Sequence, residues 1–427
     1  MKLKIAVFLG ALIAPFFVSA NQCEVEQQTL QSLTADLTQA QALVDATQAA
    51  VDTQQAVVDD ACAPPPPVIT NWADALDPYI PAVGEMVLIP NTDITAVLLQ
   101  NGGTDADVYL KTWASGLGIS SWVGMSFDYN NGVARLIAPG GDGNGGANSV
   151  YRFDVASLTW HRDHDFAQPV SPFPDLVDAD GDGQAECVGL VDGPVASHSY
   201  DGIVYVPTIS ASITLGTAGN RFNWDCYSKA VSHYQWKWLD SGQWQLMTDA
   251  AGAPIPSDSY VRSVYDAERD RVYYIGKTTG RLWELNPHTN ERIELADVFP
   301  DTTGSTMTML GRDVYYTTHN GGFYRFNVDA ATGFVGPITQ LLDYSQWYSK
   351  GWGLAGSGDL IVGWDGDRTF YHWDTTTNIG QEIIAAGSVP PPGSDERVYG
   401  KFIAVPGKPG VFMGISDNQG WILYRAF

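Results

Sequence analysis

A strand pattern that recurs from about residue 70 to the C-terminus constrains the fold of this chain more than any other feature. Each copy has a turn pair such as Asn-Gly or Asp-Gly, followed by three to five β-branched or aromatic residues. The strand patterns begin at residues 133, 203, 272, 314, 360 and 411, at intervals of 70, 69, 42, 46 and 51. Turn residues beside runs of Val, Ile and Tyr are typical of antiparallel hairpins. The chain is therefore predicted to contain six copies of one small sheet.

A second strand pattern follows each of the first. These second patterns lie at 150–154, 234–238, 282–285, 323–326, 370–374 and 421–424. A unit of about 40–50 residues with several strands predicts a β-propeller. We expect an all-β fold with six blades, the last completed by a strand at 85–89 or 108–112. Seven blades are the alternative, if residues 84–113 form a sheet of their own.

One unit resembles a known repeat family. Gly140 and Gly141 are followed by the aromatic Phe153 and, seven positions later, by Trp160. This order is similar to a kelch repeat, in which glycines let strands pack closely near the axis and aromatic rings fill the space between blades. The resemblance implies a kelch-like propeller over residues 71–427. It implies no particular activity, because the other units keep only the rhythm of strands and turns.

The two longest intervals exceed a blade by some 20–30 residues, which predicts an insertion at 163–230. Within it, acidic residues alternate in a tight turn, so their oxygens converge, and Ca²⁺ takes six to eight oxygen ligands. The pattern resembles the Asp-rich loops of integrin-type propellers and thrombospondin-type repeats. The resemblance implies a structural calcium ion held by Asp178, Asp180, Asp182, Gln184 (through its backbone carbonyl) and Glu186.

The N-terminus predicts export. Residues 1–20 have a basic start, a short apolar run and a small-residue exit, as in a secretory signal peptide. No later apolar run is long enough to cross a bilayer. We therefore expect a secreted, periplasmic or cell-surface protein, in which Cys187 and Cys226 can form a disulfide. That pairing is inferred from position alone, since four cysteines allow three arrangements.

Residues 21–62 predict a coiled-coil stalk. Between 24 and 61 there is no Gly or Pro, and apolar residues recur every seven positions at Leu30, Leu37, Val44, Val51 and Val58. Such a helix would be about 57 Å long, so Cys23 and Cys62 at its two ends could not meet within one straight helix. We favour a homo-oligomer in which like cysteines pair between chains. The alternative is a single helix packed on its own head domain.

The proline run in residues 63–70 predicts a stiff linker between stalk and head. The chain has 23 Lys and Arg against 48 Asp and Glu, a net charge of −25. Such a surface repels phosphate backbones and anionic lipids, which argues against nucleic acid as a partner.

No catalytic constellation stands out, so a binding protein is favoured over an enzyme. Aromatic residues between two strand patterns are candidates for contacting a ligand, with packing between blades as the alternative; they are Tyr344, Trp347, Tyr348 and Trp352. We expect a secreted or surface protein, multimerised by its stalk, that recognises a glycan or a protein. A secreted polysaccharide lyase or hydrolase with its site on the central face, and a structural component of an envelope or matrix, are the alternatives.

Overall fold

A computed structural model of the chain describes most of the predicted head. The described residues are 70–94, 123–137, 150–164, 201–216, 234–258, 261–276, 280–296, 306–318, 322–333, 335–342, 352–387, 398–415 and 420–427, with short pieces at 41, 47, 97, 176–177, 186–187, 194 and 199. The chain divides into two compact units, Met1–Pro64 and Pro65–Phe427. The predicted signal peptide and stalk lie outside the described residues, except that Gln41 and Thr47 have helical backbone.

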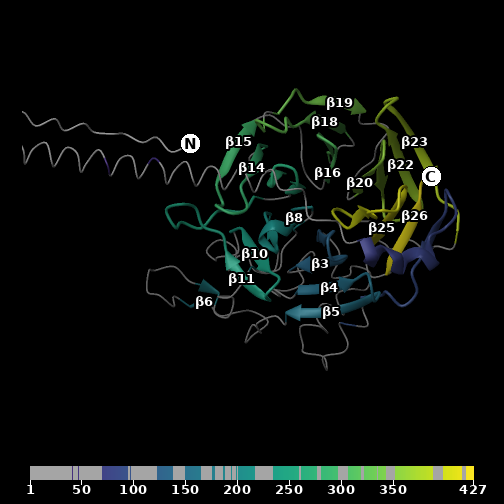
Figure 1. The fold of residues 1–427 in the computed structure, drawn as a ribbon, viewed down its shortest axis with the longest axis horizontal. Helices are drawn as coiled ribbons and strands as arrows, with labels where there is room; N and C mark the ends of the chain where they lie inside the picture. Colours follow the sequence, from purple (N-terminus) through teal and green to yellow (C-terminus); the bar gives the residue numbers. More distant parts are fainter. Residues whose placement is uncertain are drawn as a thin grey trace, which may run out of the picture. The chain divides into compact units, whose positions relative to one another are not determined.

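Six four-stranded antiparallel sheets, named blades 1 to 6 in chain order, form a ring in the second unit (Figure 1). Blade 1 contains β2 (Ser126–Asp128), β3 (Val133–Ile137), β4 (Val150–Asp154) and β5 (Thr159–His164). Blade 2 contains β8 (Ile203–Val206), β9 (Ala211–Thr214), β10 (Trp236–Leu239) and β11 (Gln243–Leu246). Blade 3 contains β12 (Arg262–Asp266), β13 (Arg271–Ile275), β14 (Leu282–Leu285) and β15 (Arg292–Ala296).

Blade 4 contains β16 (Met307–Leu310), β17 (Asp313–Thr317), β18 (Phe323–Asn327) and β19 (Thr339–Leu342). Blade 5 contains β20 (Gly353–Ser357), β21 (Leu360–Trp364), β22 (Thr369–Asp374) and β23 (Ile379–Ile384). Blade 6 contains β24 (Phe402–Ala404), β25 (Val411–Ile415) and β26 (Trp421–Arg425). The first strands of consecutive blades contact one another from β2 to β24, so the blades follow the chain around a common centre. The predicted six-bladed propeller is confirmed.

The N-terminal part of this unit closes the ring. Strand β1 (Met86–Leu88) pairs antiparallel with β26, with Met86 opposite Tyr424 and Leu88 opposite Ile422. It is the outer strand of blade 6, as expected for 85–89. Within the described residues, this segment therefore completes the sixth sheet and does not begin a seventh.

A 3-10 helix, η1 (Thr70–Tyr79), precedes β1 and packs on blades 1 and 6. Its Trp72 is buried, lies 5.4 Å from the ring of Phe127 and donates from Nε1 to the carbonyl oxygen of Tyr129 at 3.1 Å. Gly132 has φ +66°, and a Cβ there would overlap the Trp72 indole, so this turn position requires glycine for both reasons. On blade 6, Lys408 pairs with Asp74 and Asp77 of η1.

In blade 2, the strand predicted from the sequence occupies a different place in the sheet from its counterparts in the other blades. The sequence pattern aligned 203–206 with the second strands of the other blades, but this segment is β8, the first strand. The Asp201-Gly202 pair before it is not the hairpin turn. The turn is instead formed by η2 (Pro207–Ile209) and Ser210, which has φ +48°. The Asp-Gly signal was misleading because the Asp201 side chain is held in the interior, as described below.

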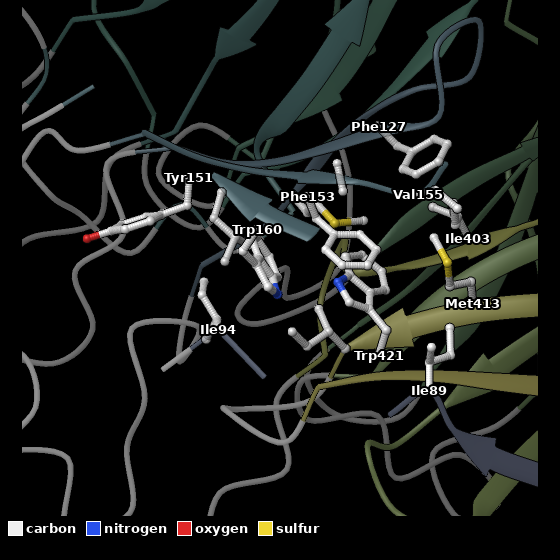
Figure 2. Close-up of a cluster of buried hydrophobic side chains, with 14 of the residues drawn as sticks. Ile89, Ile94, Phe127, Tyr151, Phe153, Val155, Trp160, Ile403, Met413 and Trp421 are labelled. Carbon is white, nitrogen blue, oxygen red and sulfur yellow. The ribbon is translucent and has the colours of Figure 1, made fainter. Parts of the chain in front are cut away.

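Buried apolar clusters fill the seams between most neighbouring blades. The seam between blades 6 and 1 holds Phe153, Trp160, Met413 and Trp421 (Figure 2). Phe153 lies directly opposite Trp160 on β4 and β5, and its ring stacks on Trp421 at 4.9 Å. The aromatic residues of the sequence motif at 150–160 therefore pack between two blades.

Candidate functional site

Most of the predicted calcium ligands lie outside the described residues, namely Asp178, Asp180, Asp182 and Gln184. The segments on either side of them are described as backbone. Strands β6 (Leu176–Val177) and β7 (Glu186–Cys187) form a two-stranded hairpin in which Val177 is opposite Glu186. Cys226, the expected partner of Cys187, also lies outside. In the described part of the chain, no group of three or more His, Cys, Asp or Glu is placed to hold a metal ion.

Of the four aromatic candidates, Tyr344, Trp347 and Tyr348 also lie outside the described residues. Trp352 is described, and its side chain is 9% exposed in a cluster with Leu354 and Trp373. Trp352 thus packs between blades 4 and 5.

The repeat places one pair of opposed side chains at an equivalent position in every blade. In each blade, β-strands two and three form a hairpin whose central pair of side chains faces the next blade. These central pairs are Arg135 and Arg152, Ile213 and Lys237, Tyr273 and Glu284, Tyr315 and Arg325, Val362 and His372, and Met413 and Leu423 in blades 1 to 6. Like charges directly opposite one another on neighbouring strands are destabilising. Among these six described pairs, blade 1 alone has two cations.

Blade 2 supplies the groups that hold Arg135. The guanidinium Nη2 lies 2.9 Å from Asp240 Oδ1, and its Cζ lies 5.2 Å from the centre of the Tyr205 ring. The Tyr205 hydroxyl donates to Asp240 Oδ2 at 2.8 Å. Burial raises the pKa of Tyr205, and the bond to Asp240 raises it further, so this hydroxyl stays a donor. The ion pair therefore has a fixed geometry across the seam between blades 1 and 2.

Arg135 still has unused donors. Arg135 is 6% exposed, and its Nε and Nη1 have no hydrogen-bond acceptor within the described structure. A guanidinium carries five N–H donors, and leaving buried donors unpaired costs about 1–3 kcal/mol. Both nitrogens are enclosed by the protein, so Arg135 shapes the seam from the inside and is not itself exposed to a ligand.

The second arginine is held by its own blade. Arg152 Nε lies 3.0 Å from both carboxylate oxygens of Asp163 on β5. Asp128, at the end of β2, accepts from the backbone N–H groups of Asn130 and Asn131 and from the Asn131 side chain. These side chains are therefore oriented before any ligand arrives.

Together these residues line an open groove of about 450 Å³ between blades 1 and 2. Its lining is Asp128, Asn131, Val133, Arg135, Arg152, Asp163, Trp238, Asp240, Ser241 and Gly242. Pockets that bind small ligands typically measure about 300–1,000 Å³ and combine apolar walls with a few placed polar groups. We call this site the blade 1–2 groove.

A second buried polar cluster lies at the first strands of the blades. Asp201, before β8, accepts from Thr306 Oγ1 at 3.0 Å and from the backbone N–H of Met307 at 2.7 Å. Burial raises the pKa of Asp201 to about 8, against the opposing effect of these bonds and of nearby Arg262 and Lys401.

Both cations of this second cluster bind backbone carbonyls in other blades. Arg262 Nη1 donates to Thr317 O at 2.9 Å, and Lys401 Nζ donates to Val123 O at 2.8 Å. Because the two cations bridge neighbouring blades and Asp201 connects blade 2 with the start of blade 4, we interpret the cluster as a brace of the ring.

Sequence reasoning did not single out the groove residues. The repeat did contain a usable signal. Tyr-Arg-Phe occurs at both 151–153 and 324–326, and this match aligns equivalent strands of two blades. Position 135 places an arginine inside an otherwise apolar strand, Val-Ala-Arg-Leu-Ile. Aligning the blades by register would have identified this position as unusual.

No protein-family model and no curated protein sequence matches the chain. Among solved structures, the chain is similar to one described as "Crystal structure of Nidogen/Laminin Complex". That match has a TM-score of 0.39 and 11% sequence identity, and it covers 61% of this chain and 79% of the other. No statement about function is taken from it. Among the described residues, no helix has both the length and the apolar character needed to cross a membrane.

Proposed function

We propose that this chain is a secreted or cell-surface binding protein whose propeller head recognises a glycan or a protein through the blade 1–2 groove. The observation that carries the proposal is Arg152, a 28% exposed cation that lines the groove directly opposite a second cation, Arg135. Asp163 and Asp240, which are 23% and 31% exposed, place accessible acceptors in the same groove. The opposed arginines of blade 1 support the same conclusion.

The proposal includes the stalk expected from residues 21–62. A parallel coiled coil would present several heads at once, and several weak sites on one assembly gain apparent affinity through effective concentration. Its support is the heptad pattern, and because residues 21–70 contain no Lys or Arg, no interchain salt bridge sets the number of chains. Electrophoresis without reductant tests it, because interchain Cys23 or Cys62 bridges would give a covalent multimer.

The proposal also keeps a structural calcium ion at 178–186 and a kelch-like repeat at 140–160. The calcium site is supported by the spacing of the acids and by the hairpin that joins the two ends of the loop. Calorimetric titration of calcium into chelator-treated protein tests it, and the absence of both heat and a melting shift would contradict it.

The function itself is tested on glycan and protein arrays with the full chain and its Arg152→Lys variant. We expect the wild-type protein to be retained on a defined set of ligands and the variant to lose that retention. A parallel assay for new reducing ends or unsaturated products separates a binder from a lyase or hydrolase. Release of such products by the wild-type protein would replace the binding proposal with an enzymatic one.

A further inference from the structure

The blade 1–2 groove offers hydrogen-bonding groups of two complementary kinds. Arginine nitrogens donate only, and ionised carboxylate oxygens accept only. Each carboxylate oxygen of Asp163 and Asp240 accepts one bond and has a second lone pair, whereas Asp128 is buried and its Oδ1 already accepts two bonds. The groove thus has oriented acceptors beside the partly exposed guanidinium of Arg152, whose Nε alone is hydrogen-bonded to Asp163.

The charges of the groove disfavour an ionic ligand. Three aspartates face two arginines, so a free anion meets more negative than positive charge, on a chain whose net charge is −25. A cation would instead lie beside Arg135 and Arg152. A group that donates and accepts at once fits this lining better than either ion.

A hydroxyl is such a group, since it has one O–H donor and two acceptor lone pairs. Several adjacent hydroxyls on one small ring are the defining chemistry of a sugar. Val133 and Trp238 are buried beneath the groove, at 8% and 1% exposed, so the contacts of a ligand fall to the polar side chains. Resting on the binding function above, we propose that the blade 1–2 groove binds an uncharged saccharide through adjacent hydroxyl groups, which accept from Arg152 and donate to Asp163 and Asp240.

The repeat provides a matched control for this proposal. Arg152 on β4 and Arg325 on β18 occupy the same register position in blades 1 and 4, within the same Tyr-Arg-Phe sequence. Both are partly exposed, at 28% and 33%, and both have an aspartate nearby. Only Arg152 lines the groove. A lysine keeps the charge but loses the planar fork of donors, so the same substitution at the two positions separates groove chemistry from general effects on the blade.

The experiment is calorimetric titration of the full chain with two sets of probes. The first set is uncharged oligosaccharides of glucose, mannose, galactose and xylose, and the second is oligogalacturonate. The proteins are the wild type, Arg152→Lys, Arg325→Lys and Arg135→Lys, each checked for an unchanged melting transition. We expect an uncharged oligosaccharide to bind the wild type, Arg152→Lys to weaken that binding at least tenfold, and Arg325→Lys to leave it within twofold. Because Arg135 is buried, Arg152→Lys is the deciding variant if Arg135→Lys does not fold.

Three results would overturn the inference, and they are distinguishable from one another. Groove-dependent binding of oligogalacturonate alone, or of a protein ligand alone, would refute the saccharide assignment and leave the binding function intact. Equal weakening by Arg152→Lys and Arg325→Lys would place the ligand elsewhere. No binding to any saccharide or protein probe would refute both the inference and the proposed function.

Discussion

The two flanks of blade 1 are built on the same backbone register and have opposite chemistry. On one side, the central pair of blade 6, Met413 and Leu423, faces blade 1 and is fully buried. Figure 2 shows Met413 beside the rings of Phe153 and Trp421. On the other side, the central pair of blade 1, Arg135 and Arg152, faces blade 2 across the groove.

The first flank stabilises the ring, and the second has features that cost stability. Burying apolar surface contributes about 25 cal/mol per Å², without directional requirements. Opposed guanidinium groups repel one another, and their aspartate partners must first be desolvated. Departures from local packing rules of this kind are expected at functional sites. The comparison shows how a repeated fold can combine two roles: apolar packing between blades stabilises the ring, and one seam between blades has polar groups suited to recognition.

The largest effect is expected from placing the groove's chemistry in the apolar seam. Met413→Arg places a cation at a position that is 0% exposed and packed among apolar side chains. The free energy of unfolding should fall by about 5 kcal/mol or more, because the charge is desolvated without a partner. Urea denaturation measures this, and a loss below about 2 kcal/mol would show that the seam opens easily to water.

Trp421→Ala should have the next largest effect. Its indole stacks on Phe153 and lies 6.1 Å from the ring of Trp160. Removing a fully buried Trp should reduce the unfolding free energy by about 3–5 kcal/mol. Ile379→Ala is the control, since Ile379 is 65% exposed on the outer strand of blade 5 and should change it by less than about 0.5 kcal/mol. Similar losses in the two variants would contradict the role of this seam.

The other flank of blade 6 gives a pH-dependent test. His372 Nε2 lies 2.8 Å from the Tyr424 hydroxyl, and burial lowers the pKa of His372 to about 4. Between pH 6.5 and 4 the unfolded chain binds a proton that the folded chain does not, so stability from this group is complete above pH 6.5 and lost as pH falls towards 4. The unfolding free energy of the wild type minus that of His372→Gln should therefore shrink over this range.

The difference between the two proteins isolates His372 from other titrating groups. Asp201, whose pKa is raised, acts in the opposite direction, because its ionisation destabilises the folded state as pH rises from 3.8 towards 8. Both proteins contain Asp201, so its contribution cancels. A difference that stays constant from pH 7 to pH 4.5 would show that His372 titrates normally.

The smallest change in stability is expected from the reciprocal substitution in the groove. Arg135→Met introduces the residue that blade 6 has at the same register position. Relief of the repulsion with Arg152 offsets the lost ion pair, and Asp240, 31% exposed, remains accessible to water. The unfolding free energy, measured by urea denaturation, should change by no more than about 1 kcal/mol. A large destabilisation would instead make Arg135 a structural residue.

Much of the architecture follows from local patterns in the sequence. The β-branched and aromatic runs at 133–137, 272–275 and 411–413 all became second strands, and 85–89 supplied the closing strand. Blade 2 did not follow the pattern, because its Asp-Gly pair serves an interior hydrogen-bond network that joins residues more than 100 positions apart. Local turn chemistry carries no information about such contacts.

The candidate site was less predictable than the fold, since it combines residues from two blades. Arg135 and Asp240 are 105 positions apart, and each alone resembles an ordinary polar residue of a strand or turn. The acidic loop and the aromatic residues at 344–348, which the sequence did single out, lie outside the described residues and stay predictions.

By itself, the sequence determined that the chain forms repeated antiparallel sheets with turns at defined places, because strand alternation and turn preferences act over a few residues. Only the tertiary structure decided which seam holds apolar rings and which holds opposed arginines. That assignment depends on which blade is next in the ring and on which side chains the closed ring brings within hydrogen-bonding distance.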